Sequence, residues 1–367
     1  MGKKVLAIVA FSMLLSGCTV KLPVAVPGAS TGGGSVWKSS DSGETFSSKV
    51  VVTVDGAEQK ITSADVLNFV FSPSDQQVIY MGTLGSGLFK TIDGAEHWEK
   101  LVFPPTKIYG LTIDRSNANL VYASGVISDV GKVYRSEDGG KEWKEVYTEP
   151  GAGTVITALG SSPDVPSTIY AGTSAGVIIK SMDGGETWKN VFVAKGPITD
   201  LVFHPGLPAT VTFLIFSKGT IMSSDGGGTW NDYASLSANA SSSSQTGTAV
   251  DLTALQPSGI TTLVADPSRP GLLYAGGSNG LFKSDNYGES WQALPIIESS
   301  RKFPIRSVAI SPKNSAEVIY VSGSAFYKSI DRGMTWSTIQ LKIDRGVSVI
   351  EYTPNASEII YFGLRKF

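Results

Sequence analysis

Ser181-Met182-Asp183-Gly184-Gly185-Glu186-Thr187-Trp188 is one of seven copies of a pattern, Ser-x-Asp-x-Gly-x-Thr-Trp, that decides the fold of this chain. The other copies vary at a few positions and begin at Ser39, Thr91, Ser136, Ser223, Ser284 and Ser329. The third residues of the seven copies are Asp41, Asp93, Asp138, Asp183, Asp225, Asn286 and Asp331, and successive positions differ by 52, 45, 45, 42, 61 and 45. A period in the forties is typical of one four-stranded sheet per repeat.

The residues between the copies repeat as well. An apolar run ends in a proline turn, as at 67–73, and a second run such as Ile169-Tyr170 follows. A glycine-rich turn then leads into a third run, as at 280–284, and the residues after the tryptophan supply a fourth. Short strands that are divided by tight turns, with no helix between them, form antiparallel sheets.

Each residue type in the pattern has a physical role. Asp and Ser side chains bond nearby backbone N–H groups and lock a hairpin turn, and glycine supplies the positive φ that such a turn needs. The closing aromatic ring is Trp in six copies and Phe46 in the first, and we expect these rings to pack between sheets as core residues.

The two ends of the chain hold complementary parts of one repeat. Residues 347–354 and 359–363 read as a first and a second strand with no pattern after them. Residues 36–39 read as a third strand with no first or second strand before it. A blade shared between the ends hides two sheet edges. The sequence therefore predicts an all-β chain with a single seven-bladed β-propeller of four-stranded antiparallel blades, closed by N- and C-terminal strands.

The pattern resembles the Asp-box, or BNR repeat, of sialidases, xyloglucanases, sortilins and a photosystem II assembly propeller. The resemblance covers the chain from about Ser35 to its end. Sialidases have six blades and an arginine triad that is not evident here, and xyloglucanases place paired acidic residues between two propellers. The resemblance therefore implies the fold and leaves two functions open, a binding scaffold or a divergent glycoside hydrolase.

The first residues predict export. Lys3 and Lys4 precede an apolar stretch at 5–15, which is too short to span a bilayer. Leu15-Ser16-Gly17-Cys18 resembles a lipobox, which implies cleavage before Cys18 and a lipid on its thiol. The alternative is an ordinary secretory signal. We therefore expect a signal peptide at 1–17, a lipidated tether at 18–34, a propeller at 35–367, and a protein anchored at the bacterial cell envelope.

The amino-acid composition limits the classes of partner and cofactor that we expect. Thirty Lys and Arg nearly balance 32 Asp and Glu, for a net charge of −2, so we expect no nucleic acid partner. Cys18 is the only cysteine, so packing rather than disulfides must stabilise the domain. His97 lies inside a box and His204 beside a proline, without other metal-ligand residues around them. We expect a monomer without cofactor or metal.

Candidate binding residues come from the propeller face opposite the boxes, where first strands begin around a central channel. Arg306 and Tyr109 stand out among these first-strand starts, which are Leu67, Tyr109, Thr157, Thr199, Thr261, Arg306 and Ser348. An arginine there can bind a carboxylate through two bonds or simply be solvated. A connector at 298–304 presents Arg301 and Lys302, and a short excursion at 124–132 presents Asp129. The insertion at 231–259 is either a lid or a tolerated loop.

No pair of acidic residues is evident for acid–base hydrolysis, since many aspartates are used in boxes. We therefore predict no catalytic residues. The hypothesis that we favour is a non-catalytic scaffold that recognises a protein or a glycan, and the alternative is a carbohydrate-active hydrolase.

Overall fold

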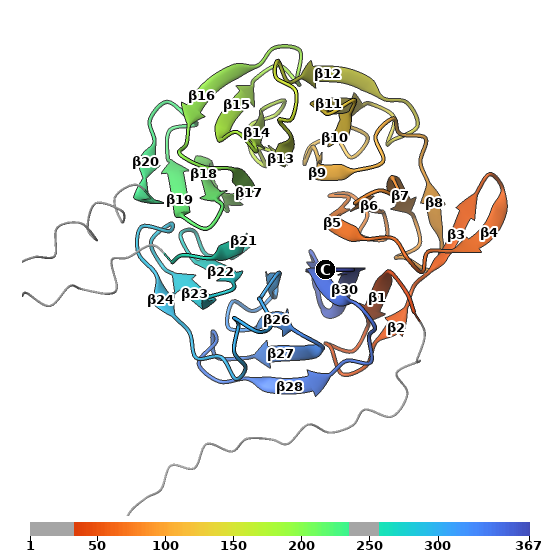
Figure 1. Ribbon diagram of the computed structural model, residues 1–367, viewed down its shortest axis with the longest axis vertical. Helices are drawn as coiled ribbons and strands as arrows, with labels where there is room; N and C mark the ends of the chain where they lie inside the picture. The colour runs from red at the N-terminus through yellow and green to blue at the C-terminus, as the bar shows by residue number, and fades with distance from the viewer. Residues whose placement is uncertain (1–32, 235–256) are drawn as a thin grey trace, which may run out of the picture.

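Seven β-sheets surround a central axis in the computed structural model, which describes residues 33–234 and 257–367 (Figure 1). The first strand of each blade lies closest to the axis, and later strands lie further out. The predicted signal peptide, Cys18, most of the tether and the middle of the insertion lie outside the described residues. The described ranges contain no helix that is long and apolar enough to cross a membrane.

The blades follow one another in chain order, each as an antiparallel meander. Blade 1 holds β5 (Val66–Phe71), β6 (Ile79–Thr83), β7 (Leu88–Thr91) and β8 (Trp98–Lys100). Blade 2 holds β9 (Ile108–Ile113), β10 (Val121–Ile127), β11 (Val130–Ser136) and β12 (Lys144–Thr148). Blade 3 holds β13 (Ile156–Ser161), β14 (Ile169–Thr173), β15 (Val177–Ser181) and β16 (Lys189–Val193).

The next three blades have the same order of strands. Blade 4 holds β17 (Ile198–His204), β18 (Leu207–Ile215), β19 (Gly219–Ser223) and β20 (Asn231–Asp232). Blade 5 holds β21 (Ile260–Ala265), β22 (Leu273–Gly277), β23 (Gly280–Ser284) and β24 (Gln292–Ala293). Blade 6 holds β25 (Val308–Ile310), β26 (Val318–Ser322), β27 (Ala325–Ser329) and β28 (Ser337–Gln340).

Blade 7 combines both ends of the chain, as the sequence predicted. Its strand order is β2 (Ser47–Ser48), β1 (Val36–Ser39), β30 (Ala356–Arg365) and β29 (Gly346–Thr353). Strand β1 pairs antiparallel with β30, from Val36 opposite Gly363 to Ser39 opposite Ile360. The seven blades are complete within residues 36–365, so this segment contains the whole closed ring.

The boxes have the predicted geometry. In the fourth box, Ser181 Oγ donates to Asp183 Oδ1 at 2.8 Å and accepts from Gly185 N at 2.8 Å. Asp183 Oδ1 also accepts from Thr187 N at 2.9 Å, and Gly185 has a φ of 92°. Asn286 makes the corresponding bonds with Ser284 and Ser290 in the sixth box. An amide can therefore take the place of the carboxylate.

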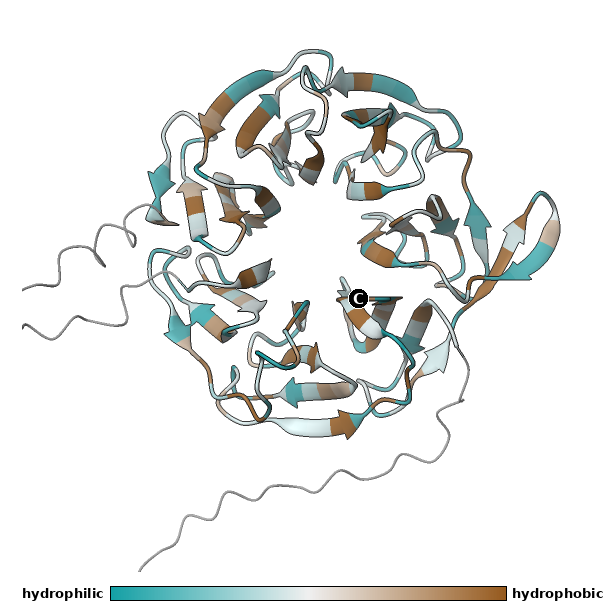
Figure 2. Cartoon of the chain, in the orientation of Figure 1, coloured by the Kyte–Doolittle hydropathy of each residue, from teal (hydrophilic) through white to brown (hydrophobic). Residues whose placement is uncertain are grey.

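Apolar side chains fill the interfaces between neighbouring blades rather than one common centre. One cluster joins Val349 of blade 7 to Phe69 and Trp98 of blade 1, and another joins Tyr170 of blade 3 to Phe213 of blade 4. Figure 2 shows apolar segments on the strands of every blade. Each blade is therefore stabilised mainly by the two blades beside it.

The closing aromatic rings are less uniformly buried than predicted. Phe46, Trp98 and Trp291 are buried, but the other four rings are only partly buried: Trp143, Trp188, Trp230 and Trp336. Trp188 still packs between blades, and its Nε1 donates to Val146 O of the preceding blade at 3.1 Å. The predicted packing of these four rings between sheets is confirmed, whereas their complete burial is not, because each ring keeps part of its surface exposed.

A hairpin that the sequence analysis did not predict lengthens the first repeat. Strands β3 (Val51–Val54) and β4 (Ala57–Lys60) project from the outer edge of blade 1 (Figure 1). Strand β3 runs parallel to β8, with Val52 opposite Trp98. Val52 is buried, so the hairpin covers the blade 1 tryptophan and accounts for its low exposure.

Candidate functional site

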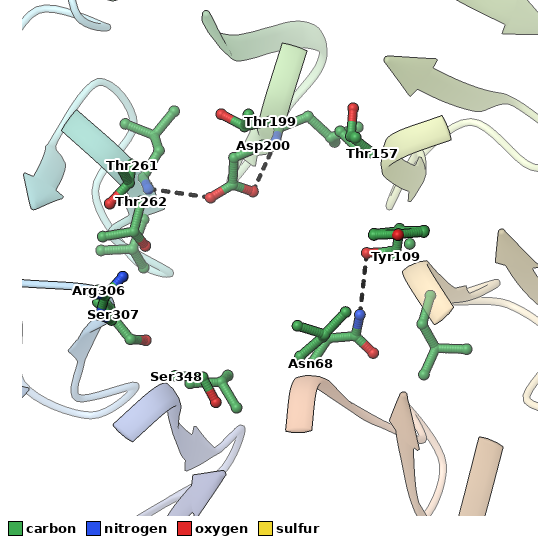
Figure 3. Close-up of a pocket in the computed structure, with 18 of the residues that line it drawn as sticks. Asn68, Tyr109, Thr157, Thr199, Asp200, Thr261, Thr262, Arg306, Ser307 and Ser348 are labelled. Carbon is green, nitrogen blue, oxygen red and sulfur yellow. Dashed lines mark hydrogen bonds between the residues drawn. The ribbon is translucent and has the colours of Figure 1, made fainter. Parts of the chain in front are cut away.

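A cavity of about 420 Å³ lies on the central axis of the ring. All seven predicted first-strand starts line it: Leu67, Tyr109, Thr157, Thr199, Thr261, Arg306 and Ser348. Figure 3 labels six of these residues, all except Leu67, and shows them arranged around an open centre. The periodic spacing of the repeats thus located the cavity wall correctly.

Hydrogen bonds between neighbouring blades hold this wall in place. Asn68 Nδ2 donates to Tyr109 O at 3.2 Å, which joins blades 1 and 2. Thr157 Oγ1 donates to Ile198 O, and Ser348 Oγ donates to Val66 O at 2.6 Å. These short polar side chains are therefore partly used to join blades, which makes the cavity rigid before any ligand arrives.

Two buried polar atoms of the wall have no hydrogen-bond partner within the described residues. They are Asn68 Oδ1 and Thr199 Oγ1, and both residues line the cavity. A buried polar atom without a partner costs free energy that a hydrogen bond can recover. Both atoms are shielded from solvent, and Asn68 Oδ1 faces Gly82 of β6, so they do not offer a ready hydrogen-bonding site to the cavity.

Asp200 and Glu351 also line the cavity, and the sequence analysis missed both. Asp200 accepts hydrogen bonds from Leu201 N at 2.8 Å and from Leu263 N of blade 5 at 3.1 Å. Burial raises the pKa of Asp200 to about 7. Burial and then the charge of Asp200 raise the pKa of Glu351 to about 8. Near neutral pH, Glu351 is therefore largely protonated and uncharged.

Arg306 is a cationic residue of the cavity wall and forms no ion pair among the described residues. Its guanidinium carbon lies 3.6 Å from the centre of the Phe367 ring. Burial, and then the nearby charge of Arg365, lower the pKa of Arg306. An unpaired guanidinium that faces a polar cavity can bind a carboxylate or another acceptor.

The structure separates the other three candidate residues from the central cavity. Arg301 lines a neighbouring cavity of about 410 Å³ beside Asn279, and Lys302 lines a smaller one of about 170 Å³ with Phe303 and Phe367. Asp129 lies in the turn between β10 and β11 with a φ of 63°. It is not among the residues that line the central cavity.

Both histidines have structural contacts. His204 is fully buried, and its Nε2 lies 2.9 Å from Thr212 Oγ1; burial lowers its pKa to about 4. His97 Nδ1 lies 2.9 Å from Asp93 Oδ2 inside the second box. Within the described ranges, no group of three or more His, Cys, Asp or Glu residues is arranged to hold a metal ion.

The fold and its boxes define a class, a seven-bladed β-propeller of the Asp-box type with a polar central cavity. A family model described as "Sortilin-Vps10: Sortilin, neurotensin receptor 3" matches residues 131–258, which is less than half of the chain. No curated protein matches the sequence.

Solved structures with similar folds include enzymes and a peptide-bound protein. The GH74 xyloglucanase from Xanthomonas campestris aligns with a TM-score of 0.64 at 16% identity, over 83% of this chain and 51% of the enzyme. This chain thus spans about half the length of that enzyme. A structure of YCF48 bound to D1 peptide aligns with a TM-score of 0.59 at 17% identity, over 82% of this chain and 92% of YCF48. YCF48 from Cyanidioschyzon merolae gives a TM-score of 0.60 at 15% identity, over 86% and 98%. At these identities the similarity shows the fold alone.

Proposed function

We propose that this protein is a non-catalytic binding or assembly scaffold, anchored at the bacterial cell envelope through a lipid on Cys18, that recognises a protein or a glycan through its channel-mouth face. The observation that carries the proposal is the central cavity, to which every blade contributes at least one side chain. Its wall is preformed, because hydrogen bonds between neighbouring blades hold it in place. Rigid polar concavities of this kind favour recognition because little ordering is needed on binding.

The similarity to YCF48 supports this proposal. One YCF48 structure contains a D1 peptide, and this chain covers most of that protein's length. The xyloglucanase, in contrast, is about twice as long as the part that aligns here. The alignment with the peptide-bound protein therefore extends over nearly all of that protein, whereas the alignment with the enzyme covers about half of it.

A photo-crosslinking residue placed at Tyr109 tests the proposal. The hydroxyl of Tyr109 makes no hydrogen bond to the described residues, so its replacement leaves the fold intact. We expect adducts with a specific envelope component from position 109. The matched control carries the same residue at Lys313, an exposed position after β25 on the box face. Equal adduct patterns from both positions would contradict recognition through the channel mouth.

One observation favours the alternative, a divergent glycoside hydrolase. Asp200 and Glu351 form a pair of carboxyl groups in the cavity, and the protonated Glu351 resembles a general acid in its ionisation. Asp200, however, already accepts two backbone N–H groups, one of them from the next blade, which fits a structural role. Turnover on a panel of plant and bacterial glycans tests this alternative. Hydrolysis that is lost in Glu351→Gln would establish an enzyme and overturn the scaffold.

The lipid anchor is tested separately. Cys18→Ala removes the thiol that would carry the lipid, so the protein should leave the membrane fraction when cells are lysed and fractionated. Cys18→Ala that remains membrane-bound after high-salt washing would show that another feature holds the protein there.

A further inference from the structure

Two copies of the triplet Arg-Lys-Phe meet between blades 6 and 7. Arg301-Lys302-Phe303 lies in the connector before β25, and Arg365-Lys366-Phe367 lies at the end of β30. Lys302, Phe303 and Phe367 line one shallow cavity of about 170 Å³, together with Arg306. We call the six residues of the two triplets the basic-aromatic patch. It joins segments that are far apart in the sequence.

Positive charge gathers around the Phe367 ring, since Arg365 lies against this ring and Lys302 lines the same cavity as Phe367. Arg301, Lys302, Arg365 and Lys366 form no ion pair among the described residues. The Arg365 guanidinium lies 5.4 Å from the centre of the Phe367 ring, on which Arg306 also stacks. Holding like charges this close is unfavourable unless an anion joins them. The whole chain, in contrast, has a net charge of −2.

The acidic residues near the patch are few. Asp65 lies 3.6 Å from Arg345, and its carboxylate accepts a hydrogen bond from the backbone of Lys366 at 2.7 Å. Asp344 lies in the connector before β29, and Glu298 lies in the connector before β25. None of these carboxylates is within ion-pair distance of the four patch cations. The patch therefore keeps an attraction for external anions.

Apolar surface accompanies the charge. The Phe367 ring is 58% exposed, and Lys302 Nζ lies 5.1 Å from the centre of the Phe303 ring. The Phe303 ring packs on Gly323, where an added Cβ would lie 3.2 Å from it. Exposed aromatic rings that are flanked by lysine and arginine are typical of surfaces that rest at a lipid–water interface.

The chain enters the propeller on the same side as the patch. A Cβ added to Gly33, the first described residue, would lie 3.3 Å from Asp344 Oδ2. Gly346, two residues after Asp344, lies close to the patch, since a Cβ added to it would lie 2.8 Å from the Phe367 ring. The connector before β29 thus contacts both the entry point of the chain and the patch. A tether from Cys18 would bring this side toward the membrane.

We propose that the basic-aromatic patch docks on a membrane surface through anionic phospholipid headgroups, which orients the propeller. The orientation rests on the proposed anchor at Cys18, whereas the affinity for lipid belongs to the patch alone. The patch occupies the sector of blades 6 and 7, and Tyr109 belongs to blade 2, which blade 1 separates from blade 7 (Figure 1). Docking would therefore tilt the disc and leave the side of the channel mouth near Tyr109 open to a partner.

Vesicle binding by residues 33–367, which contain the complete ring, tests the patch without signal peptide or lipid. We expect sedimentation with vesicles of equal parts phosphatidylcholine and phosphatidylglycerol, and none with phosphatidylcholine alone. A variant with both Lys302→Gln and Lys366→Gln should bind the anionic vesicles more weakly, by about fivefold for each lysine removed. Binding should also weaken as salt rises. The matched control is Lys141→Gln with Lys313→Gln, two exposed lysines of the box face, which should bind like the wild type.

Three results would overturn the proposal: equal binding to both kinds of vesicle, equal loss in the patch and control variants, or no binding to either. If neither kind of vesicle is bound, binding to poly-glutamate should be measured as well. Binding by the wild type that the patch variant loses would identify the patch as a site for an acidic polypeptide instead. Phe367→Ser, which keeps every charge, should weaken vesicle binding without affecting the melting temperature. The measurement involves no partner, so it is independent of crosslinking at Tyr109.

Discussion

At several blade interfaces, two side chains of one blade bond the same carbonyl oxygen in the box of the next blade. Tyr170 Oη and Lys180 Nζ of blade 3 donate to Gly226 O of blade 4 at 2.8 and 2.7 Å. The same arrangement recurs for Tyr80 with Lys90 at Gly139, Tyr122 with Arg135 at Gly184, and Tyr361 with Lys38 at Gly94. The box therefore does more than lock its own hairpin, since its glycine carbonyl also attaches it to the preceding blade.

Tyr170→Phe should lower the free energy of unfolding by about 1 kcal/mol, because one partly buried hydrogen bond is lost while Lys180 still satisfies Gly226 O. Denaturant unfolding followed by tryptophan fluorescence measures the change. The control is Tyr109→Phe, which removes a hydroxyl that makes no hydrogen bond to the described residues and should leave stability unchanged. Equal effects of the two substitutions would show that the attachment contributes nothing.

The closing tryptophans differ in how deeply they are buried. Trp98 is 1% exposed under the β3–β4 hairpin, so Trp98→Ala should cost about 3–5 kcal/mol as a core truncation. Trp188 is only partly buried, so Trp188→Ala should cost at most the lower end of that range. Thermal unfolding of both variants checks the order. A larger loss of stability in Trp188→Ala than in Trp98→Ala would mean that complete burial does not determine how much a closing ring stabilises the fold.

Among the structural elements, the blades were predictable because the residues of each repeat specify their own blade. The box and the apolar runs recur in every copy, and the proline turn recurs in all but the second, where Arg115 replaces the proline. The incomplete repeats at 36–39 and 347–363 revealed the shared blade. The β3–β4 hairpin escaped prediction because it carries no box. Its Asp55-Gly56 turn, with both φ angles positive, was the available signal, together with the spacing of 52 before the second box.

Closure by β1 and β2 should be essential for folding. Deleting residues 33–48 removes the partner of β30 and exposes a long sheet edge next to Phe362 and Ile360. We expect loss of the near-ultraviolet circular dichroism signal and association of the protein in size-exclusion chromatography. A synthetic peptide of residues 33–50, added during refolding, should restore both properties. A deletion variant that stays monomeric and folded would contradict closure through the shared blade.

At the scale of the whole molecule, the cavity has properties that no single repeat encodes. The ring of first-strand starts was predictable because those residues occupy one position in every repeat. Asp200 and Glu351 were not, because they occupy different positions in their repeats and come to line one cavity only when the ring closes. The basic-aromatic patch has the same origin, since its two triplets come from a connector and from the last strand.

Glu351→Gln should change how stability depends on pH. The folded-state pKa of Glu351, about 8, lies above the value near 4.3 of an unfolded chain, so the folded state binds more protons across that interval. The wild type should therefore lose stability as pH rises from about 5 to 8, and Asp200, with its pKa raised to about 7, adds to the loss. Melting temperatures of the wild type and Glu351→Gln should diverge with rising pH, in favour of the variant. Glu298→Gln, in an exposed connector, should follow the wild type. Parallel curves for all three proteins would mean that Glu351 ionises freely, and that the closed ring does not enclose its carboxyl group.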